Sequence, residues 1–192
     1  MIATDIARRD TAWVYTHMDI LAELNRQAWL PWGEKWDMDP YGTNPRINSY
    51  ALLRTLIEQE ADFFSATLNE RIVGFGAGVT LQPGFVETHE WWQPSRTFEV
   101  VPQYGDYELH MVFVDEEFRN NGVFKQLANV RLTYALQSGA PRIWLNTIER
   151  PAWPPTVQNF YTGHDFRIAG RMSIKGSKRV FMVRSVTPRK SN

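Results

Sequence analysis

The segment whose residues are best suited to bind a ligand is a polar turn that separates an apolar stretch from an amphipathic one. The first N–H groups of a helix lack acceptors within the helix and lie at the positive end of its dipole, so backbone alone can hold a pyrophosphate there. Gly122 lets the backbone approach a ligand closely, and the basic side chains on either side suit phosphate oxygens. The predicted anion-binding residues are Arg119, Asn120, Asn121, Gly122, Val123, Phe124 and Lys125.

An ordinary capped helix is the alternative for this turn. In that structure Asn120 or Asn121 caps the helix, and Gly122 only relaxes a tight turn. The residue types alone leave both interpretations open.

Two ionisable side chains lie in the apolar stretch before the turn. Residues 107–114 predict a strand, and a period of two places Glu108 and His110 on one face with Val112 and Val114. Partial burial raises the pKa of a carboxyl group, which suits a general base that acts directly or through water. We therefore take Glu108 as the candidate base and His110 as its substitute. The alternatives are a carboxylate paired with an arginine and a hydrogen-bonded structural histidine.

Hydrophobic periodicity predicts the elements that must position these residues. The helix after the turn has the best pattern, with Val123, Leu127, Val130 and Tyr134 on one face. Residues 31–42 are rich in helix breakers and predict a loop. We expect helices at residues 19–29, 48–60, 121–138 and 156–162, and strands at residues 13–15, 63–67, 72–81, 107–114, 143–147, 166–173 and 179–186.

This order of elements predicts an α/β (α+β) fold, with a mixed, mostly antiparallel central sheet flanked by helices. The strand–helix–strand unit from residue 107 to 147 should be a right-handed crossover that forms a parallel pair beside the turn. Residues from about 82 to 106 form a long aromatic-rich insertion. The length of 192 residues fits a single domain, residues 1–192, that includes this insertion.

The run that starts at the end of the 107–114 strand resembles the acyl-CoA signature of the GNAT superfamily, the acetyl-CoA-dependent N-acetyltransferases. The signature reads Val-x-x-x-x-(Arg/Gln)-x-x-Gly-x-(Gly/Ala), between the fourth strand and the third helix of that fold. Val114, Arg119 and Gly122 match it at the required spacing, and Phe124 occupies the final small-residue position. The resemblance implies a GNAT-like fold, acetyl-CoA as co-substrate, and pairing of the backbone at Val112 and Val114 with the pantetheine arm.

A second run supports the resemblance. Residues 160–166, with the sequence Phe-Tyr-Thr-Gly-His-Asp-Phe, are similar to the family's Phe-Tyr-x-x-x-Gly-Phe motif, with Asp165 in place of Gly. Pro154 stands where the family frequently has Asn. Asn146, at the end of the preceding strand, is our candidate for that cofactor-binding role.

Acyl transfer to an amine requires a deprotonated amine, a polarised thioester oxygen and a stabilised leaving thiolate. The resemblance implies that Tyr161 is the acid, because a Tyr at this position of the family lies near the CoA sulfur. Alternatively, Tyr161 has no catalytic role and is a helix residue that packs on the sheet. Glu108 lies eleven residues before Arg119, a separation that matches the base of histone-type members. The chain has no cysteine, which favours direct attack in a ternary complex over an acyl-enzyme.

Aromatic and acidic side chains gather in the loop after the first helix and in the insertion. Aromatic faces beside carboxylates suit a cationic amine with apolar or ring surface, so we expect a small-molecule amine acceptor. A protein lysine or N-terminus is the alternative acceptor, and a non-catalytic acyl-CoA-binding module is the alternative of another class. Instead of contacting an acceptor, the tryptophans could pack the insertion onto the domain. The candidate acceptor-contacting residues are Trp32, Glu90, Trp91 and Trp92.

Composition limits the partners. Lys and Arg together number 21, as do Asp and Glu, so no global field attracts nucleic acid or an anionic membrane. The four histidines show no ligand spacing, so we expect no metal. No apolar run reaches the ~18 residues of a membrane span, and no secretion signal is seen, so we expect a cytoplasmic protein. Because family members are often dimers, a homodimer stays among the expectations.

Overall fold

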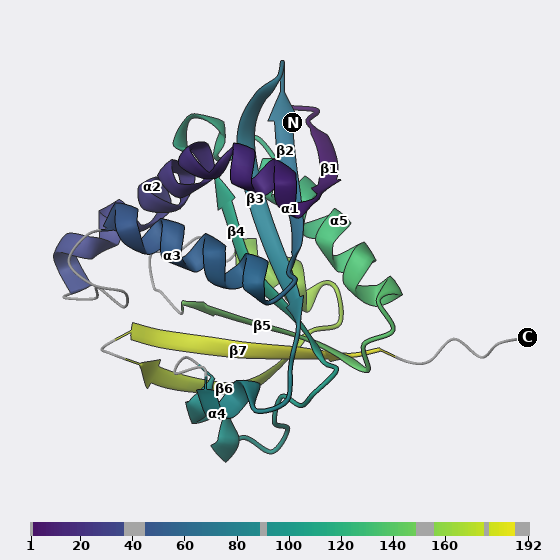
Figure 1. Ribbon diagram of the computed structural model, residues 1–192. Helices are drawn as coiled ribbons and strands as arrows, with labels where there is room; N and C mark the ends of the chain where they lie inside the picture. The colour runs from purple at the N-terminus through teal and green to yellow at the C-terminus, as the bar shows by residue number, and fades with distance from the viewer. Residues whose placement is uncertain (1, 37–44, 89–91, 149–155, 175–176, 187–192) are drawn as a thin grey trace, which may run out of the picture. The chain divides into compact units, whose positions relative to one another are not determined.

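The computed structural model of the protein describes residues 2–36, 45–88, 92–148, 156–174 and 177–186. Its strands are β1 (Asp5–Arg9), β2 (Asp62–Leu68), β3 (Arg71–Thr80), β4 (Tyr107–Val114), β5 (Arg142–Ile148), β6 (Arg167–Ile174) and β7 (Ser177–Ser185). Within the described residues they form one sheet, in the order β1-β2-β3-β4-β5-β7-β6 (Figure 1). The pairs β1–β2, β2–β3, β5–β7 and β6–β7 are antiparallel, whereas β4 and β5 are parallel. This confirms the predicted fold class.

The chain divides into two compact units. The first contains residues 1–79 and 110–133, and the second contains residues 80–109 and 134–192. The division crosses β4, so the turn belongs to the first unit and Glu108 to the second. The helices of the described residues are α1 (Thr11–Thr16), α2 (Met18–Trp36), α3 (Pro45–Glu58), α4 (Phe85–Thr88), α5 (Val123–Gln137), α6 (Thr156–Thr162) and the 3-10 helices η1 (Gln93–Thr97) and η2 (Glu116–Phe118).

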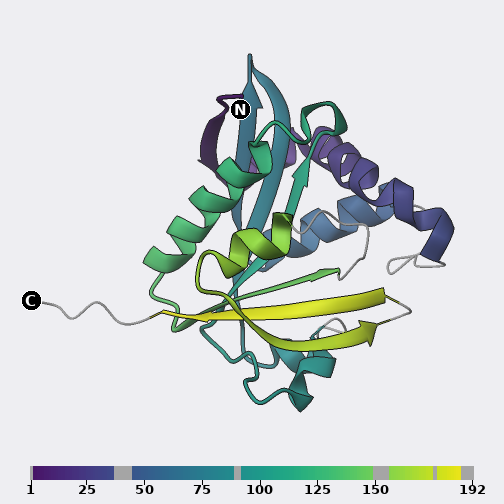
Figure 2. The same ribbon diagram turned by 180° about the vertical axis from the view of Figure 1, so that it is seen from behind.

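An apolar core in the first unit lies between its helices and one face of its strands. Figures 1 and 2 show α2 and α3 side by side on one face of β2 and β3, with α5 on the opposite face. Burial of this many large apolar side chains is the main favourable term in the stability of the unit. The core residues include Val14, Leu21, Leu53, Leu56, Phe63, Phe75, Met111 and Phe113.

Two glycines of β3 allow α5 to pack directly on the sheet. A Cβ at Gly74 would lie 2.8 Å from Cδ1 of Leu127, and a Cβ at Gly76 would lie 2.7 Å from Cδ of Arg131. Arg131 is 1% exposed, and its Nη2 donates to the carbonyl oxygen of Ala77 at 2.6 Å. The close approach therefore requires glycine at both positions, and it fixes the helix that follows the turn.

In the second unit, the insertion packs on one face of β5, β7 and β6, and α6 lies on the other (Figures 1 and 2). The ring of Phe98 lies over Gly170 of β6, where a Cβ would come within 2.2 Å of its Cε1. The same ring lies 5.2 Å from the ring of Phe181, centre to centre. On the opposite face, Nη1 of Arg184 donates to the carbonyl oxygen of His164 at 2.9 Å. The insertion is thus part of the packed structure of this unit.

Most predicted elements agree with the structure, including the hairpin, the strand 107–114 and the helix 156–162. The strand predicted at residues 13–15 is wrong, because these residues belong to α1. Oδ1 of Asp10 accepts a hydrogen bond from the amide of Trp13 at 2.7 Å, and this cap starts a helix. The strand ahead of the first helices is β1 instead, which the sequence patterns did not predict.

Two helix boundaries and one helix face also differ from the prediction. Residues 31–36 continue α2 rather than forming a loop, so the helix-breaking propensity of Pro31 and Gly33 is overridden here. The remainder of that predicted loop, residues 37–42, lies outside the described residues. α3 begins at Pro45, and proline is favoured at the first helical position. In α5, Val130 is 38% exposed and Arg131 is buried instead, because the space above Gly76 admits its long side chain.

Candidate functional site

The turn between β4 and α5 has a backbone that few residue types adopt. Asn120 (φ 64°) and Gly122 (φ 88°) both lie in the left-handed region, which glycine adopts readily and asparagine tolerates. α5 then begins at Val123 and runs for 15 residues, so its first N–H groups follow the turn directly. This geometry suits a turn that presents backbone N–H groups to an anion.

Hydrogen bonds fix the course of the turn. Nε of Arg119 donates to the carbonyl oxygen of Val114 at 3.1 Å, and Nδ2 of Asn121 donates to the carbonyl oxygen of Arg119 at 3.2 Å. The amide of Ile2 donates to the carbonyl oxygen of Asn121 at 3.0 Å. Nε2 of Gln126, in the first turn of α5, donates to the carbonyl oxygen of Ile2 at 2.7 Å. The turn is therefore closed from within and bound to the N-terminal segment.

An ion-pair cluster connects the start of the turn to β3. Asp115 caps η2 by accepting from the amide of Glu117 at 3.1 Å, and it also accepts from Nη2 of Arg71 at 2.8 Å. The same nitrogen lies 2.8 Å from Oε2 of Glu117. The hydrogen bonds to Asp115 and then to Glu117 raise the pKa of Arg71 above its ordinary value. The guanidinium carbon of Arg71 lies 5.0 Å from the ring centre of Phe118, so a cation–π contact also links β3 to η2.

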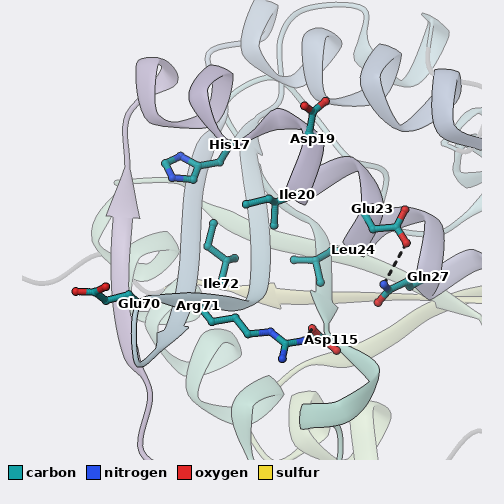
Figure 3. A pocket seen from close by; sticks show the side chains of 10 residues that line it. All are labelled: His17, Asp19, Ile20, Glu23, Leu24, Gln27, Glu70, Arg71, Ile72 and Asp115. Carbon is teal, nitrogen blue, oxygen red and sulfur yellow. Dashed lines mark hydrogen bonds and ion pairs between the residues drawn. The ribbon is translucent and has the colours of Figure 1, made fainter.

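A cavity of about 580 Å³ lies beside this cluster, within the first unit (Figure 3). Ile20 and Leu24 of α2 and Ile72 of β3 form its apolar part, and polar side chains of α2 form another part. Figure 3 shows the side chain of Arg71 extending toward Asp115 at one edge. No sequence pattern singled out this cavity, because its walls come from three segments that are far apart along the chain.

In the second unit, Glu108 is held by the insertion. Its side chain is 1% exposed, and its Oε1 accepts a hydrogen bond of 3.0 Å from Nε1 of Trp92. Trp92 is fully buried, and its observed contacts are this hydrogen bond and the packing of its ring. Its predicted contact with an acceptor stays a prediction. Of the other predicted acceptor contacts, Trp32 lies in α2, and Glu90 and Trp91 lie outside the described residues.

A second buried carboxylate supports the start of β4. Asp106 is 0% exposed and accepts from Nε of Arg142 at 3.0 Å and from Nε1 of Trp144 at 2.8 Å. Its Oδ2 also accepts from the amide of Gln103 at 2.9 Å. Sequence reasoning missed this group, although an acidic residue directly before an apolar strand was a signal. The network joins the insertion to β5 at the point where β4 and β5 pair.

Exposure along β4 separates its two halves. In the second half, the half-buried residues His110, Val112 and Val114 alternate with buried ones, as the period of two predicts. Residues 107–109 are all buried, so this pattern of exposure does not extend to Glu108. Glu108 is covered by the insertion instead, and the periodicity of the strand could not predict this contact.

The second sequence motif has a backbone that matches its pattern. Asp165 has a φ of 64°, which is the left-handed conformation. Glycine adopts this conformation without steric cost, which explains why the motif has glycine at this position. Tyr161 is 4% exposed, and its ring packs against Phe166 at 5.3 Å between ring centres. The amide of Phe166 donates to the carbonyl oxygen of Tyr161 at 3.1 Å. On β5, Oδ1 of Asn146 accepts from Nη1 of Arg179. Neither arrangement tests the predicted acid or the predicted asparagine role.

The predicted residues thus fall into two groups. The first unit holds His110, Val112, Val114 and the turn of residues 119–125, in which Lys125 is exposed and Phe124 is half-buried. The second unit holds Glu108, Asn146 and Tyr161. No helix in the described part of the chain is long and apolar enough to cross a membrane.

Comparison with known proteins gives a family match. Residues 21–161 match the model of the Acetyltransferase (GNAT) family. A search among curated proteins gave no significant match.

Many solved structures share the fold at low sequence identity. One is an aminoglycoside 6'-N-acetyltransferase complexed with coenzyme A, at 18% identity and a TM-score of 0.59 over 97% of this chain and 99% of that one. An aminoglycoside 6'-N-acetyltransferase from Enterococcus faecium gives 17% identity and a TM-score of 0.63, with the same coverage. The ribosomal-protein-S18-alanine N-acetyltransferase from Escherichia coli gives 12% identity and a TM-score of 0.59 over 99% and 98% of the two chains.

Proposed function

Because the chain belongs to the GNAT family of acetyltransferases, we propose that it transfers an acetyl group from acetyl-CoA to a primary amine on a small molecule. The turn that opens α5 is the observation that carries the proposal. Left-handed Asn120 and Gly122 lead directly into a 15-residue helix, so the positive end of the α5 dipole lies at the turn, which suits a pyrophosphate. Exposed Lys125 adds positive charge in the same helical turn.

The residues of the first unit fit the co-substrate. The turn is closed by its own hydrogen bonds, so little ordering entropy opposes binding. The half-buried residues Val112 and Val114 lie in the strand that leads into the turn, which suits pairing of their backbone with the pantetheine arm. Acetyl-CoA supplies the activated thioester, and these residues bind and orient it.

Proton transfer is assigned to two side chains of the second unit. Glu108 accepts a proton from the attacking amine, directly or through water, and His110 is its substitute. Tyr161 donates a proton to the leaving thiolate through its phenol. Direct attack in a ternary complex fits a chain that has no cysteine nucleophile.

A small-molecule acceptor is favoured by the packed insertion. The insertion covers the face of the second unit that carries Glu108, so an extended peptide has less space there than a compact amine. Two of these structural neighbours are named for aminoglycosides, and the third is named for an alanine of ribosomal protein S18. A protein lysine or N-terminus therefore stays the second candidate acceptor.

A panel of amines and peptides tests the proposal through acetyl-CoA-dependent release of CoA. We expect turnover with at least one small amine and none with peptides. Glu108→Gln and Tyr161→Phe should each lower kcat by at least about 100-fold, the usual contribution of a positioned acid or base, while coenzyme A still binds. If the native protein does not bind acetyl-CoA, the assignment fails entirely. If it binds acetyl-CoA without turnover on the whole panel, the non-catalytic binding module is the better description.

A further inference from the structure

We propose that Trp92 is a positioning residue for Glu108, whose carboxyl group it holds in the orientation of a general base. The inference rests on the proposed function, because it assigns a role to the group that contacts the proposed base. The bond between Nε1 of Trp92 and Oε1 of Glu108 is 3.0 Å long. Trp92 is 0% exposed and Glu108 is 1% exposed, so water does not compete strongly for this bond.

The ring of Trp92 is fixed by aromatic neighbours from three segments. It lies 5.2 Å from the ring of Phe181 on β7 and 5.9 Å from the ring of Trp144 on β5, with interplanar angles of 74° and 89°. Phe85 of α4 lies 6.1 Å away on the insertion itself. Edge-to-face contacts of this kind are favourable and directional. The indole N–H therefore has one direction in which to point, and Glu108 lies in it.

The backbone of the insertion is fixed next to this ring. The amide and the hydroxyl of Ser95, which is 0% exposed, both donate to the carbonyl oxygen of Trp92, at 2.9 and 2.6 Å. Three residues further on, Phe98 lies over Gly170 and contacts Phe181. The insertion is therefore attached to the sheet on both sides of η1, by Trp92 before it and by Phe98 after it.

The pairing register brings the indole and the carboxylate together. Glu108 pairs with Trp144 in the parallel β4–β5 ladder, and Trp144 pairs with Val183 of β7. Directly paired residues point to the same face of a sheet, and so do residues two apart on one strand. Glu108, Trp144 and Phe181, which lies two residues before Val183, therefore share the face that the insertion covers. The contacts of Trp92 with all three side chains agree with this placement.

A hydrogen bond from the indole has two consequences for a base. An N–H donor stabilises a charged carboxylate relative to the neutral acid, so loss of this bond should favour the protonated form of the group. The bond also fixes the plane of the carboxylate, and thereby the direction in which its other oxygen meets a proton. Both effects act through Glu108 and require no contact between Trp92 and the substrate.

Other ionisable groups around Glu108 could alter the same pH dependence, so they define what the test must separate. His110 lies on the same strand. On β5 and β7, Arg142 is bound to Asp106 and Arg179 to Asn146. The insertion contributes Glu87, Arg96 and Glu99, which are exposed, and the edge strand β6 contributes exposed Arg167. None of these ionisable groups is changed by Trp92→Phe, which removes the indole N–H and keeps a smaller aromatic ring in its place.

The test compares Trp92→Phe with Trp144→Phe. Because the ring of Trp144 contacts that of Trp92, this control keeps an aromatic ring at the contact and leaves the bond from Trp92 to Glu108 in place. Each keeps an aromatic ring at a fully buried position, and each removes one indole N–H from a buried carboxylate: Glu108 for Trp92 and Asp106 for Trp144. We expect similar losses of thermal stability in the two variants. For Trp92→Phe alone, kcat/KM should fall roughly tenfold, and the acid-side midpoint of its pH profile should move up by roughly one pH unit.

A double-mutant cycle shows whether the effect passes through the base. In the Glu108→Gln background, Trp92→Phe should cause no further fall in kcat/KM, because no ionising carboxylate remains to be positioned. A full additional tenfold loss in that background, or an unshifted pH profile for Trp92→Phe, overturns the positioning role. If Glu108→Gln retains wild-type kcat, then both the base and its positioning residue are wrong, even though acetyl transfer itself stands. If no amine is turned over, the proposed function fails instead.

Indole signals in the folded wild-type protein keep the inference testable if Trp92→Phe does not fold. In ¹⁵N-labelled protein, the indole N–H resonance of Trp92 should shift with pH at the acid-side midpoint of kcat/KM, and this shift should vanish in Glu108→Gln. The resonance of Trp144 provides the internal control, because its partner is Asp106. A Trp92 resonance that does not respond to pH across that midpoint contradicts the inference.

Discussion

Replacement of Gly122 by alanine tests the role of the turn most directly. Gly122 has a φ of 88°, a conformation that costs an L-residue about 1–2 kcal/mol. Alanine therefore either keeps the conformation at that cost or relaxes it and moves the first N–H groups of α5. In addition, its methyl group lies on backbone that should approach the pyrophosphate closely.

The expected magnitude follows from that cost. A binding penalty of about 1–2 kcal/mol corresponds to a dissociation constant for coenzyme A that is roughly 5–30 times higher. Calorimetric titration with coenzyme A measures it directly, and thermal unfolding without ligand measures the effect on stability. For a chain of this length, each kcal/mol should lower Tm by about 2–4 °C.

Gly139 provides a matched control at the other end of α5. Its φ of 82° is nearly the same, and a Cβ there would meet nothing within 4 Å. Gly139→Ala should therefore lower Tm by a similar amount and leave the affinity for coenzyme A unchanged. If Gly122→Ala binds coenzyme A as the wild type does, while both variants lose the same stability, then the turn does not hold the pyrophosphate and the reasoning is refuted.

Three further substitutions test the packing around the site. Gly170→Ala should lower the free energy of unfolding by about 1–3 kcal/mol in a urea titration, because its Cβ would overlap Phe98; added Phe98→Ala should recover part of the loss, and strict additivity would contradict this contact. Asp106→Asn should cost about 3 kcal/mol by the same assay, because it leaves Arg142 without its buried counter-charge; a loss below about 1 kcal/mol would mean that the pair behaves as a surface pair. Asp165→Gly should raise Tm slightly, by the equivalent of up to about 1 kcal/mol, because it removes a left-handed aspartate; a lower Tm would show that the side chain of Asp165 contributes more than its backbone strain costs.

Local patterns predicted the parts of the site that lie within one segment. The strand 107–114 follows from an apolar run that only Glu108 and His110 interrupt, and the turn follows from Gly122 between a strand and an amphipathic helix. The helix of residues 156–162 and the hairpin around residue 70 were also correct. In each case the signal and the structure that it specifies are a few residues apart, so periodicity and turn chemistry are sufficient.

The same patterns were wrong where a cap, the continuation of a helix or the glycines of a neighbouring strand changed the outcome. Residues 13–15 have side chains typical of strands, yet the cap at Asp10 makes them helical. Residues 31–36 contain proline and glycine, yet they continue α2. In α5 the face was predicted to include Val130, whereas Arg131 is buried, because the glycines of β3 create space for it. The Gly-Phe-Gly run of that strand was the available signal of close approach.

The turn itself was specified by the sequence alone: its position, its left-handed glycine and the helix that it opens are all local. Which groups meet around the proposed base was decided only by the tertiary structure. Trp92 and Glu108 are sixteen residues apart, and Asp106 and Arg142 are thirty-six apart. Their contacts exist because β5 pairs beside β4 and the insertion folds back over that pair. A sequence records the propensity of each segment, but the partner of a buried polar group depends on which segments pack together, and that choice is made by the burial of the whole core.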